Sequence, residues 1–149
     1  MQTSKWGPPT WATVHTIAHN YNPEIHDPRD YKEFYRLLGK VLPCKYCRKS
    51  YQGFFKELPI DNYLGCQKDM AYWMYLMHNK VNEKLRNQGL LNKSDPSFTS
   101  VYNKYEQYRA DCSSKKGKPN TCRMPEMKNR CNGVAEVVLF TGCYHLHIK

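Results

Sequence analysis

The stretch "CQKDMAYWMYLMHNKVNEKLRNQGLL", residues 66–91, is the longest and clearest helical pattern in the chain. It contains no proline and only one glycine, Gly89, close to its end. Its apolar side chains recur every three or four positions, as on one face of an α-helix. They are Met70, Trp73, Met77, Val81 and Leu85. The stretch therefore predicts a single long amphipathic helix that packs against other helices.

The same periodicity predicts further helices on the N-terminal side of this stretch. Residues 7–21, "GPPTWATVHTIAHNY", open with prolines and continue as an apolar face. A second helix is expected over 28–41, with Asp27 as its N-cap. A third should begin at the cysteine pair of 44–47 and stop before Pro59. Few glycines and few β-branched runs favour this all-α fold over a sandwich or barrel.

The chain divides in two by composition. Residues 1–109 hold the predicted four-helix bundle and a short fifth helix from about Pro96 to Arg109. Residues 110–149 are predicted to be a basic, cysteine-containing C-terminal extension of uncertain fold. The net charge of the chain is +10, and half of it falls within 113–130. Such a run is usually solvated, although it also invites acidic partners.

"LPCKYC", residues 42–47, carries the first chemical signal. Cys44 and Cys47 stand three apart at a predicted helix start, where partial positive charge lowers the pKa of a thiol. That arrangement favours a redox pair. A zinc site usually needs a second such pair, which the sequence lacks. A thioredoxin-like domain needs a strand before the motif, where a helix is predicted instead.

The middle of the 66–91 helix carries the second signal. His78 and Asn82 lie one turn apart, and Asn79 shares their side of the helix. A solvent-facing polar stripe is the ordinary interpretation. The alternative is a slot in which a planar ligand stacks and its polar groups are hydrogen-bonded.

Three separated motifs, "WGPPTWATVHT", "PCKYC" and "WMYLMHNKVNEKL", together resemble the Erv/ALR family of FAD-dependent sulfhydryl oxidases. The resemblance runs from Trp6 to Arg109, and is greatest to the short forms of large double-stranded DNA viruses. It implies a helical bundle that holds FAD, in a homodimer. It also fits the absence of a GxGxxG phosphate loop.

The resemblance implies roles for individual residues. Cys44 exchanges with thiols of substrate proteins, and Cys47 passes the electrons to FAD. O2 then accepts them, which yields hydrogen peroxide and a disulfide in the substrate. No metal ligand is implied. The implied cofactor-binding residues are Gly7, Trp11, His15, Cys47, Trp73, His78, Asn79, Val81, Asn82, Lys84, Leu85, Lys104 and Tyr105.

The sequence also departs from the family. Tyr75 stands where many cellular members have a structural cysteine, so that disulfide is absent here. Seven cysteines are present, an odd number. The pairing of five stays open, as does the presence of a shuttle disulfide. These five are Cys66, Cys112, Cys122, Cys131 and Cys143.

Two rival functions follow from other features. One is a basic nucleic-acid-binding protein whose tail is stabilised by zinc, and the other is a structural interaction module. Most aromatic residues fall on helical core stripes, so nucleic acid is not the expected partner. The start "MQTSKWGPPTW" lacks the apolar core of a signal peptide, and "VAEVVLF" is too short to span a bilayer. We therefore expect a soluble cytoplasmic protein without a membrane partner, in host cytoplasm or virion if the chain is viral.

Overall fold

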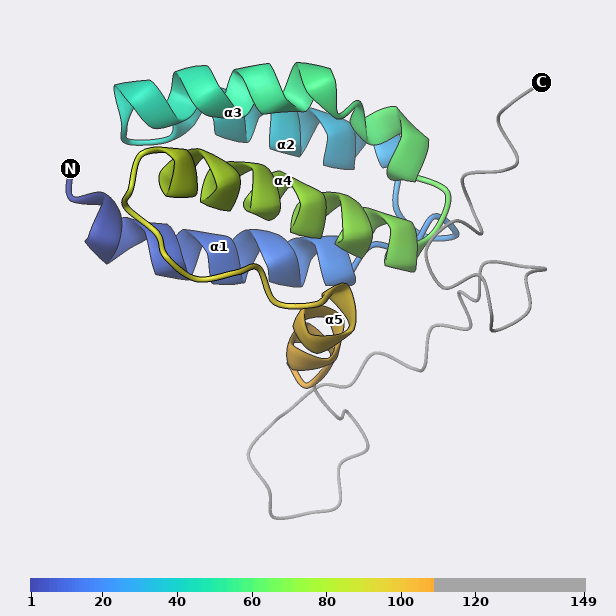
Figure 1. Cartoon of the computed structure of the whole chain (residues 1–149). Helices are drawn as coiled ribbons and strands as arrows, with labels where there is room; N and C mark the ends of the chain where they lie inside the picture. The colour runs from blue at the N-terminus through green and yellow to red at the C-terminus, as the bar shows by residue number, and fades with distance from the viewer. Residues whose placement is uncertain (109–149) are drawn as a thin grey trace, which may run out of the picture.

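The computed structural model describes residues 1–108 as a bundle of α-helices (Figure 1). Residues 109–149 lie outside the described residues. They include the predicted C-terminal extension and four of the chain's seven cysteines. The helices are α1 (Thr3–His19), α2 (Pro28–Val41), α3 (Lys45–Glu57), α4 (Gln67–Asn87) and α5 (Phe98–Glu106), with a short 3₁₀ turn η1 (Ile60–Tyr63) before α4. The expected four-helix bundle with a short fifth helix is confirmed.

The helices pack as two neighbouring pairs. α1 lies along α4, α2 lies along α3, and α3 contacts α4 between the pairs (Figure 1). The short α5 contacts the second half of α1 and the first half of α4 from outside the bundle. One end of the bundle therefore gathers the start of α1, the turn between α2 and α3, and the end of α4.

Local sequence explains most helix boundaries. The side chain of Asp27 accepts a hydrogen bond of 2.8 Å from the backbone N–H of Arg29, which caps α2 where Pro28 begins it. Ser97 caps α5 in the same way, through the N–H of Ser100. In both cases the cap satisfies a donor that the first helical turn leaves unpaired.

The start of α1 differs from the prediction. The helix begins at Thr3, so Pro8 and Pro9 lie inside it rather than opening it. Proline lacks an N–H and normally interrupts a helix. Here the N–H groups of Lys5 and Trp6 both bond to the carbonyl of Gln2, which closes a turn ahead of the prolines.

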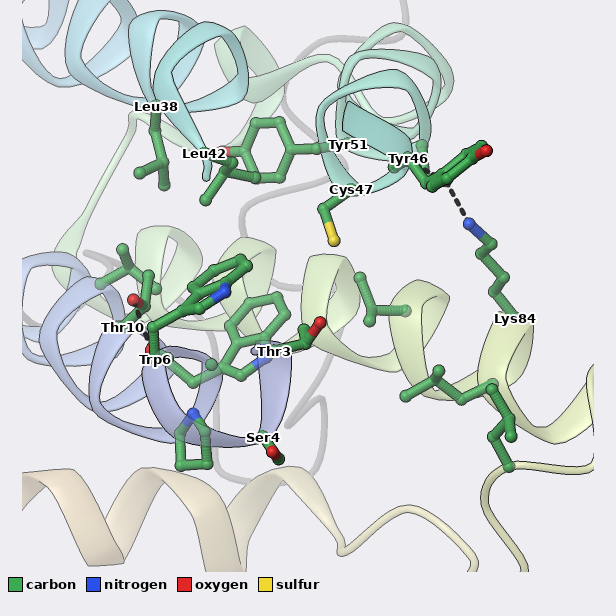
Figure 2. A pocket seen from close by; sticks show the side chains of 18 of the residues that line it. Thr3, Ser4, Trp6, Thr10, Leu38, Leu42, Tyr46, Cys47, Tyr51 and Lys84 are labelled. Carbon is green, nitrogen blue, oxygen red and sulfur yellow. Dashed lines mark hydrogen bonds between the residues drawn. The ribbon is translucent and has the colours of Figure 1, made fainter. Parts of the chain in front are cut away.

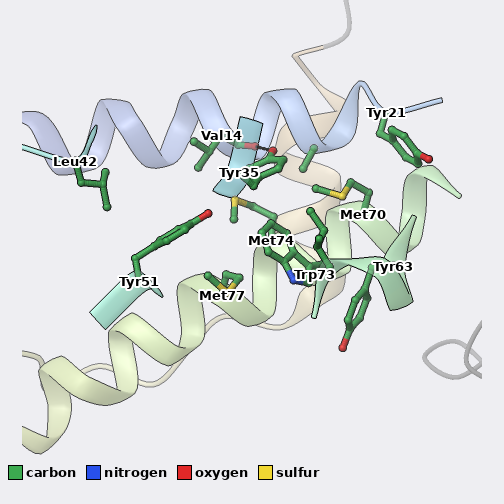
Figure 3. Packing of buried hydrophobic residues seen from close by; sticks show 12 residues of the cluster. Val14, Tyr21, Tyr35, Leu42, Tyr51, Tyr63, Met70, Trp73, Met74 and Met77 are labelled. Atoms are coloured by element: carbon green, nitrogen blue, oxygen red, sulfur yellow. Dashed lines mark hydrogen bonds between the residues drawn. The ribbon is translucent and has the colours of Figure 1, made fainter. Parts of the chain in front are cut away.

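The core is rich in aromatic and methionine side chains, and all four long helices contribute residues to it (Figure 3). Trp73 is fully buried and meets the rings of Tyr35 and Phe55 edge-on. Gly39 allows the close approach of α2 and α3, because a Cβ atom there would lie 2.6 Å from the ring of Tyr51. Among residues 1–108, no helix is long and apolar enough to cross a bilayer.

Candidate active site

Cys44 and Cys47 lie together at the start of α3. Cys44 is the N-cap residue, and its Sγ accepts a hydrogen bond of 3.3 Å from the backbone N–H of Cys47. Both side chains are half-buried, and both are free thiols. Cys66 is disulfide-bonded, so these two are the free cysteines of the described part of the chain.

The two thiols differ in acidity. Hydrogen bonds from the Cys47 thiol and from its backbone N–H lower the pKa of Cys44. Burial raises the pKa of Cys47 to about 11, against the opposing charge of Lys84. Hydrogen bonding to a thiolate stabilises it, whereas loss of solvent destabilises it. Cys44 is therefore the thiol that ionises first.

A cavity of about 660 Å³ opens beside Cys47, whose Sγ points into it (Figure 2). Its walls come from α1, α4, the end of α2 and the start of α3, and most of them are apolar. The volume falls in the range of roughly 300–1,000 Å³ that small ligands and cofactors occupy. Six of the predicted residues line it: Gly7, Trp11, Cys47, Val81, Lys84 and Leu85.

A chain of rings leads from this cavity toward α5. Trp11, on the cavity wall, stacks on His78 at 3.8 Å between ring centres, with 6° between the planes. Nε2 of His15 lies 3.1 Å from Nδ1 of His78, within hydrogen-bond distance. His15 in turn stacks on Tyr105 at 4.6 Å. Four predicted residues from three helices are thus in contact.

Both histidines of this cluster are neutral at pH 7. Burial lowers the pKa of His15 to about 3, and repulsion from Lys104 and from the protonated forms of His78 and His19 acts in the same direction. Burial also lowers the pKa of His78 to about 4. A neutral imidazole has one donor and one acceptor nitrogen, so the pair can share one hydrogen bond without repulsion.

The other predicted residues are not among those that line the cavity. The amide of Asn82 donates to Asp95 at 2.8 Å. Asn79 is half-buried on α4, and Lys104 is exposed with Nζ 5.3 Å from the ring centre of Tyr105. Trp73 is not on the cavity wall: it is fully buried, and its Nε1–H donates to the Leu58 carbonyl at 3.0 Å.

Trp6, Ser50 and Tyr51 are among the cavity residues that sequence reasoning missed. Ser50 and Tyr51 lie one turn after Cys47 on α3, so helical spacing could have found them. The Trp6 Nε1–H and the Tyr51 hydroxyl are buried and have no hydrogen-bond partner within 1–108. Buried polar groups are nearly always paired, so a ligand that fills this cavity should offer them acceptors.

These features fit FAD, the cofactor that the resemblance implies. Apolar walls and stacked rings suit an aromatic ring system, and the unpaired donors suit its carbonyl and nitrogen acceptors. The described residues hold no group of three or more His, Cys, Asp or Glu side chains suited to a metal ion. The tail cysteines of the zinc hypothesis lie outside them.

The difference in acidity predicts the order of alkylation. In the reduced protein at neutral pH, iodoacetamide should modify Cys44 at least about tenfold faster than Cys47, because each pKa unit changes the thiolate fraction tenfold. Peptide mass spectrometry over a time course measures both rates. In Cys44→Ser, Cys47 should still react slowly because its burial remains. Equal rates, or faster modification of Cys47, would contradict the assignment.

Comparison with known proteins agrees with this geometry. Residues 8–109 match the model of the Erv1 / Alr family. An FAD-linked sulfhydryl oxidase of African swine fever virus, isolate Tick/Malawi/Lil 20-1/1983, is 31% identical over 108 residues, which are 68% of this chain and 81% of the viral protein.

Cellular relatives match over a shorter part of their length. The rice FAD-linked sulfhydryl oxidase ERV1 is 31% identical over 81 residues, and the mitochondrial enzyme of that name from Saccharomyces cerevisiae is 28% identical over 82. The match covers 53% and 54% of this chain, but it spans only 41% and 42% of theirs. The crystal structure of the yeast Erv1 core has the same fold, with a TM-score of 0.61 and 22% identity over 71% of this chain and 85% of that one.

Proposed function

The chain belongs to the Erv1 / Alr family, and on that premise we propose that it is an FAD-linked sulfhydryl oxidase. It forms disulfide bonds in protein substrates, with O2 as the final electron acceptor. The observation that carries the proposal is a free CxxC pair whose inner sulfur points into a large, mostly apolar cavity (Figure 2). The family's named members supply the reaction class, and the geometry of this chain supports it.

The residues around the cavity would hold the cofactor. Trp6, Trp11 and Tyr51 provide aromatic walls and two donors, and Val81 and Leu85 provide apolar contacts. Lys84 provides a positive charge at the cavity wall. Toward α5, the proposed contacts are polar or aromatic: His15, His78, Asn79, Asn82, Lys104 and Tyr105. Trp73 supports this site from the core, through its position on α4 between the rings of Tyr35 and Phe55.

Cys44 carries the exchange with substrate. In the oxidised enzyme, a substrate thiolate attacks Sγ of Cys44, which breaks the Cys44–Cys47 bond and releases Cys47 as a thiolate. The second substrate thiolate then attacks the mixed disulfide and releases Cys44. The substrate gains one disulfide, and the enzyme gains two electrons and two protons as its dithiol. The lowered pKa of Cys44 favours it as the leaving group of this second step.

Reoxidation of the pair requires that two electrons leave through Cys47. When bound, FAD supplies the two-electron acceptor that restores the disulfide and reduces O2 to hydrogen peroxide. Lys84 assists Cys47, because its positive charge opposes the effect of burial on the pKa of that thiol. Ser50 holds Lys84 at this wall by accepting a hydrogen bond of 2.5 Å from its Nζ.

Oxygen uptake tests the proposed activity. With dithiothreitol as substrate, the purified full-length chain should consume O2 and release one hydrogen peroxide per O2. An oxygen electrode and a peroxidase-coupled dye measure the two quantities separately. Heat-denatured protein with the same amount of free FAD is the control for uncatalysed oxidation. If the chain consumed O2 no faster than that control, the proposed oxidase activity would be wrong.

We also propose a homodimer, which membership of the family favours. Light scattering during size exclusion should give twice the chain mass of 17.6 kDa. Dilution over two orders of magnitude shows whether the assembly dissociates. A mass equal to that of one chain at all concentrations would rule out the dimer without affecting the proposed chemistry.

A further inference from the structure

The net charge of the described domain comes from one segment. Residues 40–56 contain five cations and no carboxylate: Lys40, Lys45, Arg48, Lys49 and Lys56. The rest of the described chain, 1–39 and 57–108, balances ten Lys and Arg residues with ten Asp and Glu residues. The excess charge therefore surrounds the CxxC pair instead of being spread over the bundle.

Within residues 1–108, these five cations also have no carboxylate partner. None takes part in the ion pairs formed within residues 1–108. All four lysines are exposed. Lys45, Lys49 and Lys56 recur at helical spacing along one side of α3. Arg48 is fixed by a hydrogen bond of 2.6 Å from its Nη1 to the Leu42 carbonyl, which places its charge at the turn before Cys44.

Two exposed apolar side chains flank the reactive sulfur within this segment. Val41, three residues before Cys44, is 71% exposed, and Tyr46, two residues after it, is 75% exposed. A single exposed apolar residue needs no explanation. Two such residues on either side of an accessible cysteine, inside a patch of one charge sign, have the composition of a contact surface.

We propose that this surface, the CxxC rim of Lys40, Val41, Lys45, Tyr46 and Lys49, docks acidic thiol-bearing segments of substrate proteins. The docked segment of the substrate protein carries carboxylates around its cysteines. It also carries an apolar side chain beside the cysteine that attacks Cys44. This inference rests on the proposed oxidase function and names its substrate class. Opposite charge raises the rate of encounter by about 10- to 1,000-fold at low ionic strength, and salt screens the effect.

A protein segment fits the rim better than a nucleic acid does. Single-stranded nucleic acids are usually held by several aromatic platforms along a charged groove. Within 40–56, Tyr46 is the one ring that is exposed, while Tyr51 is buried. The half-buried sulfur of Cys44 also lies between Val41 and Tyr46 in the sequence, and it reacts with thiols, which a nucleic acid lacks.

Matched peptides test the proposal. Two dithiol peptides of equal length and cysteine spacing are compared on the full-length holoenzyme, one with Asp and Glu around its cysteines and one with Asn and Gln. At low salt we expect kcat/KM for the acidic peptide to be roughly tenfold higher. The difference should shrink as salt is added, and dithiothreitol, which is uncharged, serves as the reference substrate.

Charge-reversal variants locate the effect. Lys49→Glu on the rim should remove most of the preference for the acidic peptide while leaving turnover of dithiothreitol unchanged. Lys68→Glu makes the same change in net charge at the start of α4, at the opposite end of the bundle from the CxxC turn (Figure 1). It should leave the preference intact. Lys40→Glu is a second rim variant in case Lys49→Glu folds poorly.

The outcomes separate the two claims. If the unmodified chain did not turn over dithiothreitol, the proposed oxidase function itself would be wrong. Normal dithiothreitol turnover with equal rates on the two peptides would overturn the inference alone. Equal loss of preference in Lys49→Glu and Lys68→Glu would also overturn it, since the effect would then belong to net charge. Tight, Lys49-dependent binding of a single-stranded oligonucleotide without peptide preference would assign the rim to nucleic acid instead.

Discussion

Replacing Cys47 with serine should lower dithiothreitol-driven oxygen uptake by roughly a thousandfold or more, since loss of an essential nucleophile has effects of this size or larger. A serine hydroxyl can neither form the disulfide with Cys44 nor release electrons as a thiolate does. The sulfur of Cys47 is the one that points into the cavity (Figure 2). Steady-state oxygen uptake, normalised to bound flavin, measures the loss.

Cys44→Ser is the informative comparison. It removes the thiol that exchanges with substrate but leaves the Cys47 sulfur at the cavity. Uptake with a protein dithiol should fall as far as in Cys47→Ser, whereas the small dithiothreitol should retain more activity in Cys44→Ser than in Cys47→Ser. Circular dichroism should show the same helix content in both variants. Full turnover by Cys47→Ser would be incompatible with the proposed roles.

Trp73→Ala should have the largest effect on stability, lowering the free energy of unfolding by about 3–5 kcal/mol. The side chain has no exposed surface and meets the ring of Tyr35 edge-on in the core (Figure 3). It meets the ring of Phe55 in the same way. Its removal leaves a cavity in the core and an unpaired carbonyl at Leu58. Chemical denaturation followed by far-ultraviolet circular dichroism measures the change.

Trp73→Phe is the matched control, because it keeps an aromatic ring and removes the indole N–H. It should cost only about 1–2 kcal/mol, for the lost hydrogen bond and a smaller loss of packing. If Trp73 acts on the cofactor through the core, Trp73→Phe should retain bound FAD. If Trp73→Ala were as stable as the unmodified chain, the place of Trp73 in the core would be contradicted.

Helix periodicity and proline positions predicted the fold well. The bounds of α2 agree with the predicted 28–41, because Asp27 and Pro28 mark its start locally. The start of α1 differs from the predicted start, because the hydrogen bonds from the N–H groups of Lys5 and Trp6 to the Gln2 carbonyl extend the helix across two prolines. Helix propensities of single residues do not predict that hydrogen bonds ahead of the prolines will keep the helix intact.

The site was predictable only in part, because separate helices build it. Sequence spacing correctly separates two faces of α4: Trp73 and Met77 enter the core, while His78 stacks on Trp11. It does not show that Trp73 lies off the cavity wall. Nor does it bring His15 of α1 against Tyr105 of α5, a contact that depends on how α5 packs across the bundle.

The visible absorption spectrum of the purified protein, before and after dithiothreitol in air, shows whether the CxxC pair exchanges electrons with a bound flavin. We expect the bands of a bound flavin, which bleach on addition of the dithiol and return once the dithiol has been consumed. That result would establish the CxxC pair as a redox pair that exchanges electrons with FAD. A colourless protein that carries zinc would contradict it and would make the cysteine pair half of a metal site.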